Sequence, residues 1–328
     1  MKIAAYIGGL LGLALLLVLI VHSNFAAILQ ILGLGGWQLL WLIPYRALFF
    51  LFYALGWLYL LRPYDPDRHV SLGYLVWVTS VREAIDRLLP VASVGGGVVG
   101  VRLLRWRGLA AAPVGATVVV EVLLTLGVSY LFALAGVVLL IDLGGTRQDF
   151  RQLVLALLIG LPVPVVTAML LRYGSVFARF ERFLRPLVGE SALSTGATAL
   201  DHELRACLRR GRTLLVAGTW QFAALLSGSF EIWFALSLFG HPVPASDALI
   251  LESLTQAVRH IAFVIPAALG VQEAGLVLFG QALGISSELA LAVSMAKRMR
   301  EVFCGLPSLL SWQWLEARRM RIQLRTPS

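Results

Sequence analysis

The sequence has little charge and little cysteine. Only 14% of its 328 residues are charged and 59% are hydrophobic, whereas soluble domains have roughly 25% charged and 45–50% apolar residues. This composition excludes a soluble globular enzyme and a disordered or fibrous chain. The two cysteines, Cys207 and Cys304, are too few for a disulfide framework. Neither they nor the five histidines show metal-ligand spacing, and no phosphate-binding loop is present. The sequence therefore predicts no cofactor and no metal.

Long apolar runs dominate the chain instead. A run of about 18 or more apolar residues is long enough to cross a bilayer as a helix. The runs predict an all-α fold, a polytopic bundle of transmembrane helices forming one domain over residues 1–328. They are Ile3–Val21, Trp37–Leu61, Leu109–Ile141, Leu153–Leu171, Leu214–Phe239, Ala248–Val264, Gly270–Leu283 and Leu289–Leu315. The first has no cleavage site and is expected to stay as an anchor. The third is too long for one straight crossing, so either Gly127 bends it or it splits in two.

The basic residues lie mainly between the apolar runs. This arrangement argues against nucleic-acid binding, despite a net charge of +9, because loop arginines set membrane topology and cytoplasmic loops collect them. The segment 172–212 contains eight arginines, whereas 22–36 and 240–246 contain no Lys or Arg. We therefore expect a multi-pass protein of the bacterial inner membrane with both termini and the basic loop 172–212 in the cytoplasm. Within that loop, Val176–Glu190 has the pattern of an amphipathic interfacial helix, although a plain linker fits it almost as well.

Two further basic segments predict a re-entrant hairpin. Residues 62–70 and 102–107 both carry arginines and are expected inside, so residues 71–101 must enter the membrane and return. The apolar stretches within 71–101 are too short to span the bilayer. Non-helical backbone at membrane depth requires protein or a wet cavity to satisfy its polar groups.

Fourteen charged residues lie inside or near the apolar runs. The basic ones are Arg46, Arg82, Arg87, Arg259, Lys297, Arg298 and Arg300, and the acidic ones are Glu83, Asp86, Glu121, Glu231, Glu252, Glu273 and Glu301. An unpaired charge near the bilayer centre costs roughly 2.5–3.5 kcal/mol, so these groups are expected to pair or to face a hydrated cavity. Helical spacing favours the pairs Arg82–Asp86, Glu83–Arg87, Lys297–Glu301 and Arg298–Glu301, and a shared face for Glu252, Gln256 and Arg259.

The same charges allow a structural or a functional interpretation. Ion pairs that fix helix register, or interfacial side chains that reach towards water, explain any one pair about as well as a binding role does. The cluster Lys297-Arg298-Met299-Arg300 has more positive charge than its nearby acid balances. This surplus favours an anion, and lipid phosphates are the anions of a membrane.

Two proline–glycine segments interrupt the apolar pattern in the two halves of the chain. In one, Pro90 precedes Gly95 and Gly96, and in the other Pro266 precedes Gly270. Proline removes a backbone donor and glycine tolerates bends, so both segments predict broken or re-entrant helical hairpins. Paired interrupted segments are typical of transporter sites between inverted repeats. Ordinary helix kinks are the alternative, and the internal repeat is weak.

Residues around both breaks resemble a known family. The run Pro266-Ala267-Ala268-Leu269-Gly270-Val271-Gln272-Glu273, then Gly284-Ile285-Ser286 and Arg298, resembles the C-terminal signature of the lysylphosphatidylglycerol synthase transmembrane region. Pro90 with Gly95, Gly96, Gly97 and Gly100, followed by Glu121, is similar to its N-terminal signature. The resemblance covers nearly the whole chain, which is especially similar to the branch associated with hopanoid-biosynthesis gene clusters.

This resemblance implies a flippase-like integral membrane protein with two re-entrant hairpins that moves lipid between leaflets. The sequence departs from the family pattern at two places. Ala267-Ala268 replaces a frequent Gly-Gly, and Val101 and Arg102 follow Gly100 where an acid is frequent. A different headgroup preference is therefore expected. The soluble aminoacyl-transferase domain of the synthases is absent from the sequence, so lysine transfer to lipid is not expected.

The leading hypothesis is a lipid translocase that moves an anionic or hopanoid-type lipid through a polar intramembrane path. Glu121 and Glu273 are expected to hold the cations of the path apart. The cations expected to bind the headgroup are Arg82, Arg87, Arg259, Lys297, Arg298 and Arg300, and the expected hairpin breaks are Pro90, Gly95, Gly96, Pro266 and Gly270.

Two other hypotheses remain open. A membrane-embedded enzyme could use Glu121 or Glu273 as acid or base on a lipid-linked substrate. A non-catalytic subunit of a hopanoid or lipid synthesis complex could dock through the 172–212 loop. The expected partners are a lipid substrate and the bilayer, with lipid-biosynthesis proteins under the last hypothesis. The sequence does not predict the substrate, the energy source, the direction of movement or the oligomeric state.

Overall fold

The structure is a computed structural model that describes residues 14, 17–19, 25–89, 95–142, 162–173, 194–261 and 265–325. These residues form helices and short connections and contain no strand, which confirms the predicted all-α fold. In chain order the helices are α2 (Phe25–Gly35), η1 (Gly36–Trp41), α3 (Leu42–Leu61), η2 (Arg62–Tyr64), α4 (Leu72–Leu88), α5 (Gly95–Arg105), α6 (Ala111–Asp142), α8 (Pro162–Tyr173), α10 (Ser194–Leu208), α11 (Gly211–Leu238), α12 (Ala245–Ile261), η3 (Pro266–Ala268), α13 (Val271–Ala282) and α14 (Ser287–Arg325).

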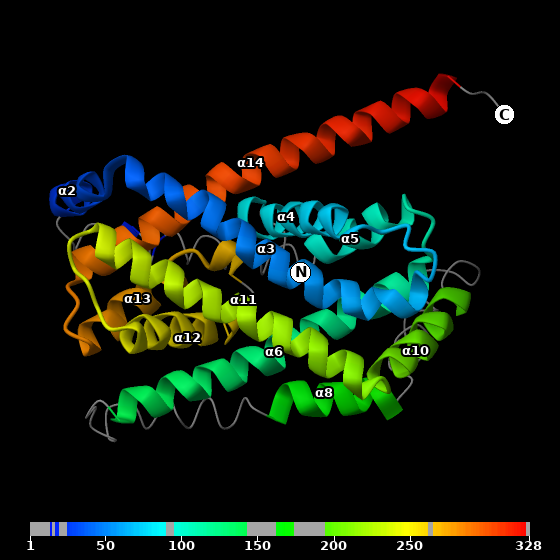
Figure 1. Cartoon of the computed structure of the whole chain (residues 1–328), viewed down its shortest axis with the longest axis horizontal. Coiled ribbons are helices and arrows are strands. Elements are labelled where there is room, and N and C mark those ends of the chain that lie inside the picture. The colour runs from blue at the N-terminus through cyan, green and yellow to red at the C-terminus, as the bar shows by residue number, and fades with distance from the viewer. Residues whose placement is uncertain are drawn as a thin grey trace.

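Three of the described helical stretches are long and apolar enough to cross a membrane. They are Phe25–Tyr64, Ala111–Asp142 and Gly211–Leu238, and in Figure 1 α3 and α11 run obliquely through the middle of the bundle while α6 runs along its lower side. The predicted run Leu109–Ile141 forms the single helix α6, so its division into two helices is wrong. At 32 residues α6 is about 48 Å long, which exceeds the roughly 30 Å hydrocarbon core.

Two pairs of shorter helices occupy the positions of the predicted hairpins. The first pair is α4 and α5, with 17 and 11 residues, and the second is α12 and α13, with 17 and 12 residues. An 11-residue helix is only about 17 Å long, too short to span the hydrocarbon core. Ser71 caps the start of α4, and its hydroxyl accepts a hydrogen bond from the Tyr74 backbone N–H at 3.3 Å.

Both helix breaks coincide with the predicted segments. Helix α4 ends at Leu88 and α5 starts at Gly95, with Pro90 outside the described residues. In the second break η3 precedes Gly270, which has a φ of 73°. Ala267 and Ala268 also have positive φ, at 53° and 48°, a conformation that favours glycine. The two alanines that depart from the family pattern therefore occupy backbone positions that suit the glycines they replace.

Two apolar cores hold the bundle together. One lies among α6, α11, α12, α13 and the start of α14, and the other among α3, α4, α5, α10 and the first half of α6. Trp57 is fully buried in the second core and its indole N–H donates to the Thr117 hydroxyl at 3.1 Å. Helix α14 packs against both α4 and α13, and α4 also contacts η3. The two pairs of shorter helices therefore meet beside α14.

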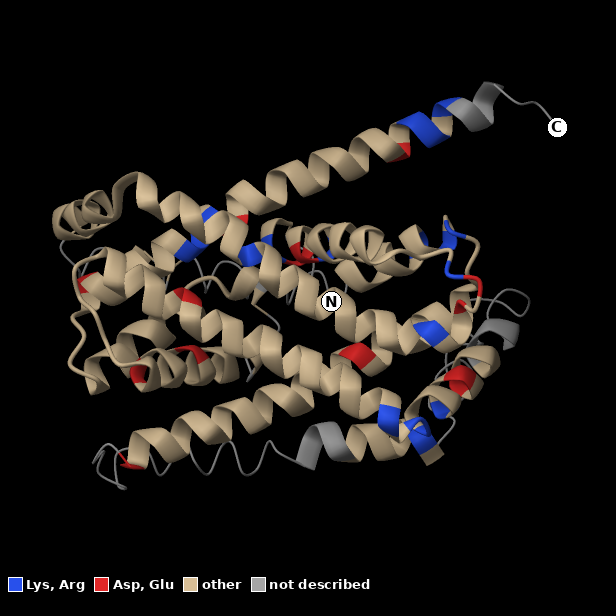
Figure 2. Ribbon diagram, in the orientation of Figure 1, with Lys and Arg blue, Asp and Glu red and all other residues tan. Residues whose placement is uncertain are grey.

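The basic segments that are described lie at one end of the bundle. The Tyr64 hydroxyl donates to the Glu203 backbone carbonyl at 3.4 Å, and the Tyr74 hydroxyl donates to that of Leu103 at 2.8 Å. Arg102 forms an ion pair with Glu316 near the end of α14. Figure 2 shows blue segments gathered at this end, on the right. The described parts of the segments predicted to share one side thus lie at the same end, while their cytoplasmic placement stays a prediction.

The predicted basic loop 172–212 is only partly described. Helix α8 ends at Tyr173, and α10 occupies 194–208. The predicted amphipathic segment Val176–Glu190 and the predicted anchor Ile3–Val21 lie outside the described residues, apart from residues 14 and 17–19.

Candidate functional site: a buried charge network

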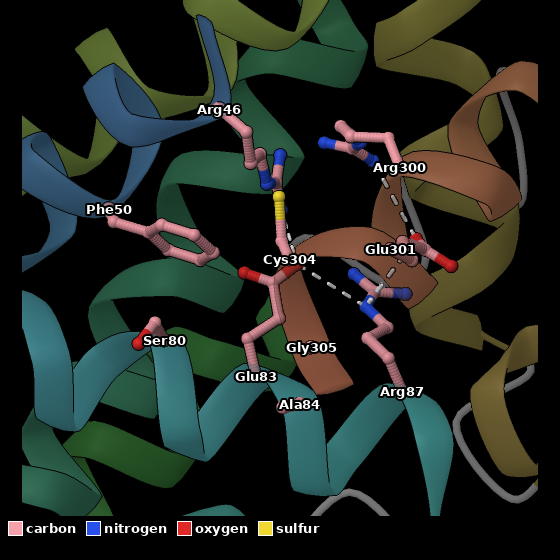
Figure 3. A pocket seen from close by; sticks show the side chains of 10 residues that line it. All are labelled: Arg46, Phe50, Ser80, Glu83, Ala84, Arg87, Arg300, Glu301, Cys304 and Gly305. Carbon is pink, nitrogen blue, oxygen red and sulfur yellow. Dashed lines mark hydrogen bonds and ion pairs between the residues drawn. The ribbon is translucent and has the colours of Figure 1, made fainter. Parts of the chain in front are cut away.

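Ionised side chains gather where α3, α4, α11 and α14 meet. Figure 3 shows those that come from α3, α4 and α14, namely Arg46, Glu83, Arg87, Arg300 and Glu301, pointing towards one another. We call this set, together with Glu231, Glu273 and Arg298, the central network. Its basic members are Arg46, Arg87, Arg298 and Arg300, and its acidic members are Glu83, Glu231, Glu273 and Glu301.

Shared carboxylates connect the part of the network between α3, α4 and α11. Arg46 forms an ion pair with Glu83 and lies 4.0 Å from Glu231. Arg87 Nε lies 3.7 Å from Glu83 and 4.0 Å from Glu301. Arg46 and Glu231 are both buried. Because one carboxylate serves two arginines, moving any of these helices changes several ion pairs at once.

Arg298 connects the network to the second helix break. Its guanidinium lies 3.1 Å from Glu273 and 3.4 Å from Glu301. It also donates to the backbone carbonyls of Ala267 at 2.9 Å and Ala268 at 3.2 Å. Arg298 therefore holds the left-handed turn of η3 as well as a carboxylate.

Glu273 and Arg300 are fixed by further buried contacts. The Ser294 hydroxyl donates to Glu273 Oε1 at 2.8 Å. Arg300 Nη1 lies 3.1 Å from Glu231 Oε2, and Nη2 lies 3.8 Å from Glu301. These contacts bring α11, α13 and α14 together around charged groups where apolar packing would be the default.

Two separate ion pairs lie outside the central network. Lys297 Nζ is 2.6 Å from Glu252, with both side chains 4% exposed. Arg82 Nη1 is 2.7 Å from Glu121, and the Arg82 guanidinium lies 4.4 Å from the Trp57 ring centre. The first pair joins α14 to α12, and the second joins α4 to α6.

Local spacing predicted only some of the pairings. The pairs Glu83–Arg87 and Arg298–Glu301 are confirmed. The predictions of the pairs Arg82–Asp86 and Lys297–Glu301 are wrong, because Arg82 and Lys297 form ion pairs with carboxylates from facing helices instead. Asp86 instead accepts the Gly96 backbone N–H at 2.9 Å and caps the start of α5.

One basic residue of the predicted site has no ion-pair partner among the described residues. Arg259 is 7% exposed, and its buried Nη2 has no hydrogen-bond partner there. Gln256, one turn earlier, donates to Glu252 at 2.8 Å. The expected shared face thus links Glu252 and Gln256 while Arg259 keeps donors free for another acceptor.

The glycines of the first break allow α5 to approach α4 closely. A Cβ atom on Gly96 would lie 2.5 Å from the Arg82 carbonyl oxygen and 2.6 Å from Asp86 Oδ2. A Cβ on Gly100 would lie 2.7 Å from Arg82 Cδ. These glycines therefore set the position of the Arg82 side chain as well as the bend.

The space inside the network is small. A pocket bordered by Phe50, Ser80 and Cys304, together with network residues, leaves about 10 Å³ open to the centre of a water molecule. That is room for about one water. The paired charges thus fill the site, and any group larger than a water requires the ion pairs to separate. Among the described residues, no group of three or more His, Cys, Asp or Glu is placed to hold a metal ion.

The structure brings half of the predicted site residues together in the central network and adds other residues to it. Arg87, Glu273, Arg298 and Arg300 share the central network, whereas Arg82–Glu121 and Lys297 lie in separate pairs. Arg46, Glu83, Glu231, Glu252 and Glu301 were not among the predicted site residues. The equal number of acidic and basic residues in the apolar runs is the sequence signal that indicates these additional residues.

The fold and the network define a polytopic α-helical membrane protein whose ionised side chains lie within the bundle. The family model described as "Lysylphosphatidylglycerol synthase TM region" matches residues 6–307. The chain belongs to this family, and its function is related to membrane lipids. No curated protein and no solved structure matches the chain.

Proposed function

We propose that this protein moves an anionic lipid between the leaflets of the membrane. The observation that carries the proposal is the central network, which buries charges from both chain halves between two broken hairpins. Charged groups inside a membrane domain are costly, and where they persist they commonly mark a substrate or ion pathway.

The headgroup passes by exchange of partners. A phosphate accepts hydrogen bonds from arginine with the same planar, two-pronged geometry as a carboxylate. A phosphate that enters the network takes the place of Glu83, Glu273 or Glu301 at an arginine, while the acyl chains stay in lipid. Arg259, with its unpartnered Nη2, supplies positive charge that no described carboxylate neutralises.

Helix movement opens the path. The network leaves room for about one water, so the hairpin α4–α5 or α12–α13 separates from α14 before a headgroup enters. A carboxylate shared between two arginines, such as Glu83 between Arg46 and Arg87, keeps a partner while one contact breaks, which lowers the cost of opening.

The proposal includes the placement of the whole domain. Residues 1–328 form one inner-membrane domain, with both termini and the 172–212 loop in the cytoplasm. The gathering of the described basic segments at one end of the bundle supports this orientation. A hopanoid-type lipid is included as cargo on the basis of the sequence resemblance.

A reconstitution experiment tests the proposal. Purified protein is placed in vesicles with fluorescent phosphatidylglycerol or phosphatidylcholine, and movement between leaflets is followed by quenching of the outer leaflet. We expect faster movement of the anionic probe by the wild type and at least a tenfold loss in the Arg298→Ala/Glu273→Ala variant. The matched control Asp67→Ala/Arg212→Ala removes one acid and one base from exposed positions and should keep the wild-type rate. Equal rates for the wild type and the Arg298→Ala/Glu273→Ala variant would refute the proposed path.

A further inference from the structure

A second basic site lies on the outer surface of the bundle, away from the central network. It is a groove of about 520 Å³ between α5, the start of α6 and the C-terminal part of α14. Arg102 and Arg105 border it from α5, Arg319 borders it from α14, and Trp106 follows α5. Ligand pockets typically measure about 300–1,000 Å³, so this groove is large enough for a phospholipid headgroup.

The groove carries more positive charge than its neighbours balance. Arg102 is paired with Glu316. The Arg319 guanidinium lies 4.5 Å from the Trp106 ring centre, and no acidic side chain of the described residues lies within ion-pair distance of it. Arg105 is exposed and likewise forms no ion pair within the described part of the chain. Two arginines on facing helices therefore remain available to one anion.

An apolar wall adjoins the charges. Val98 and Val101 line the groove from α5, and Val98 is 65% exposed. Trp106 adds an aromatic ring, and such amphipathic rings are enriched at membrane interfaces. A site for a free anion in water needs no valine wall. A phospholipid needs both parts, with cations for the phosphate and an apolar surface for the start of its acyl chains.

We propose that this groove binds the phosphodiester headgroup of an anionic glycerophospholipid from the adjoining leaflet. Arg105 and Arg319 contact the phosphate oxygens, and the glycerol and upper acyl chains lie along Val98 and Val101. The bound lipid fastens the end of α14 to α5, which the Arg102–Glu316 ion pair already connects. This site is independent of the central network, so it binds lipid whether or not the protein moves lipid between leaflets.

Lipid binding measured by native mass spectrometry tests the groove. The full chain in detergent is titrated with phosphatidylglycerol, with phosphatidylcholine and with glycerol phosphate. We expect the Arg105→Gln/Arg319→Gln variant to lose at least tenfold in phosphatidylglycerol affinity. The control Arg209→Gln/Arg212→Gln makes the same charge change at exposed positions of the same end and should stay within twofold of the wild type. Val98→Trp, at an exposed position, narrows the groove without changing charge and should also weaken binding.

Each result bears on the proposal. Selective loss in the two groove variants, with phosphatidylglycerol preferred over phosphatidylcholine and no competition from glycerol phosphate, supports it. An unchanged affinity in both groove variants, or equal binding of the two lipids, would overturn it. Glycerol phosphate binding as tightly as the lipid would show a water-soluble anion site and would overturn the lipid assignment. The central network is intact in all these variants, so failure here leaves the translocase proposal standing.

Discussion

The Lys297–Glu252 pair allows a direct measurement of how much a buried ion pair contributes to the stability of this fold. The two groups are 2.6 Å apart with both side chains 4% exposed, and neither takes part in the central network. Replacing Lys297 by Met leaves the Glu252 carboxylate buried with only the Gln256 hydrogen bond at 2.8 Å. Replacing Glu252 by Gln leaves a buried ammonium with no counter-ion. Removing one partner of a buried pair typically costs about 3–5 kcal/mol.

The double variant should recover most of that loss. Replacing both members of a buried pair by uncharged groups of similar size is often neutral or stabilising. We therefore expect each single variant to lose about 3–5 kcal/mol of unfolding free energy, and Lys297→Met/Glu252→Gln to lose about 0–2 kcal/mol. The coupling energy is then about 3 kcal/mol or more.

Unfolding by SDS in mixed micelles, followed by the fluorescence of the nine tryptophans, measures all four proteins. The Arg102–Glu316 pair provides the control, because the Arg102 side chain is 61% exposed. An exposed pair contributes about 0–1 kcal/mol, so its coupling should stay below about 1 kcal/mol. Additive losses in the Lys297 and Glu252 cycle would refute the assignment of this pair as a buried charge contact.

Substitutions at three further places in the fold test local features. Ala267→Gly or Ala268→Gly should stabilise the fold by about 1–2 kcal/mol, because glycine relieves the strain of an alanine in the left-handed conformation. The control Ala274→Gly, inside α13, should instead destabilise the fold by about 1 kcal/mol. Equal effects in the same SDS titration would contradict the left-handed turn. Gly96→Ala should destabilise the fold by about 1–3 kcal/mol, because the added Cβ atom would clash with Arg82 and Asp86. Gly73 has open space around it, so the control Gly73→Ala should not destabilise the fold. Thermal melting in detergent distinguishes the two variants. Burial opposes the charge of Asp65, but the N–H groups of His69 and Val70, each 2.9 Å away, outweigh it and hold the pKa of this carboxyl below its ordinary value. That stabilisation is complete above about pH 4 and is lost as the pH falls through the lowered pKa. Asp65→Asn should therefore be less stable than the wild type at pH 7, and the difference in stability should disappear in acid. A difference that persists at low pH would contradict this role of Asp65.

The sequence predicted the fold class and the breaks because the physical signals are local. Apolar length identifies α6 and α11, and the proline and glycine at 266 and 270 identify the second break. Charged residues in apolar runs identified the candidate site because buried charge is expensive wherever the helices lie.

The partners of those charges could not be predicted in the same way. Arg82 pairs with Glu121, which is 39 residues away, and Lys297 pairs with Glu252, which is 45 residues away. Helical spacing describes neighbours on one helix, whereas these partners depend on which helices face each other. Arg46 stands alone in its apolar run and has no local acid, so only the packing of α3 against α4 and α11 reveals its role.

A reversible lock between α4 and α14 tests the central claim most directly. The hydroxyls of Ser80 and Ser308 are 3.1 Å apart beside the network pocket, so cysteines at both positions can form a disulfide with small adjustments. Cys207 and Cys304 are replaced by alanine in this protein to exclude other bonds. If the network opens between α4 and α14 to admit a headgroup, lipid movement in vesicles falls at least tenfold on oxidation and returns on reduction. An unchanged rate in the oxidised protein, with the bond verified by mass spectrometry, would contradict a path between these helices.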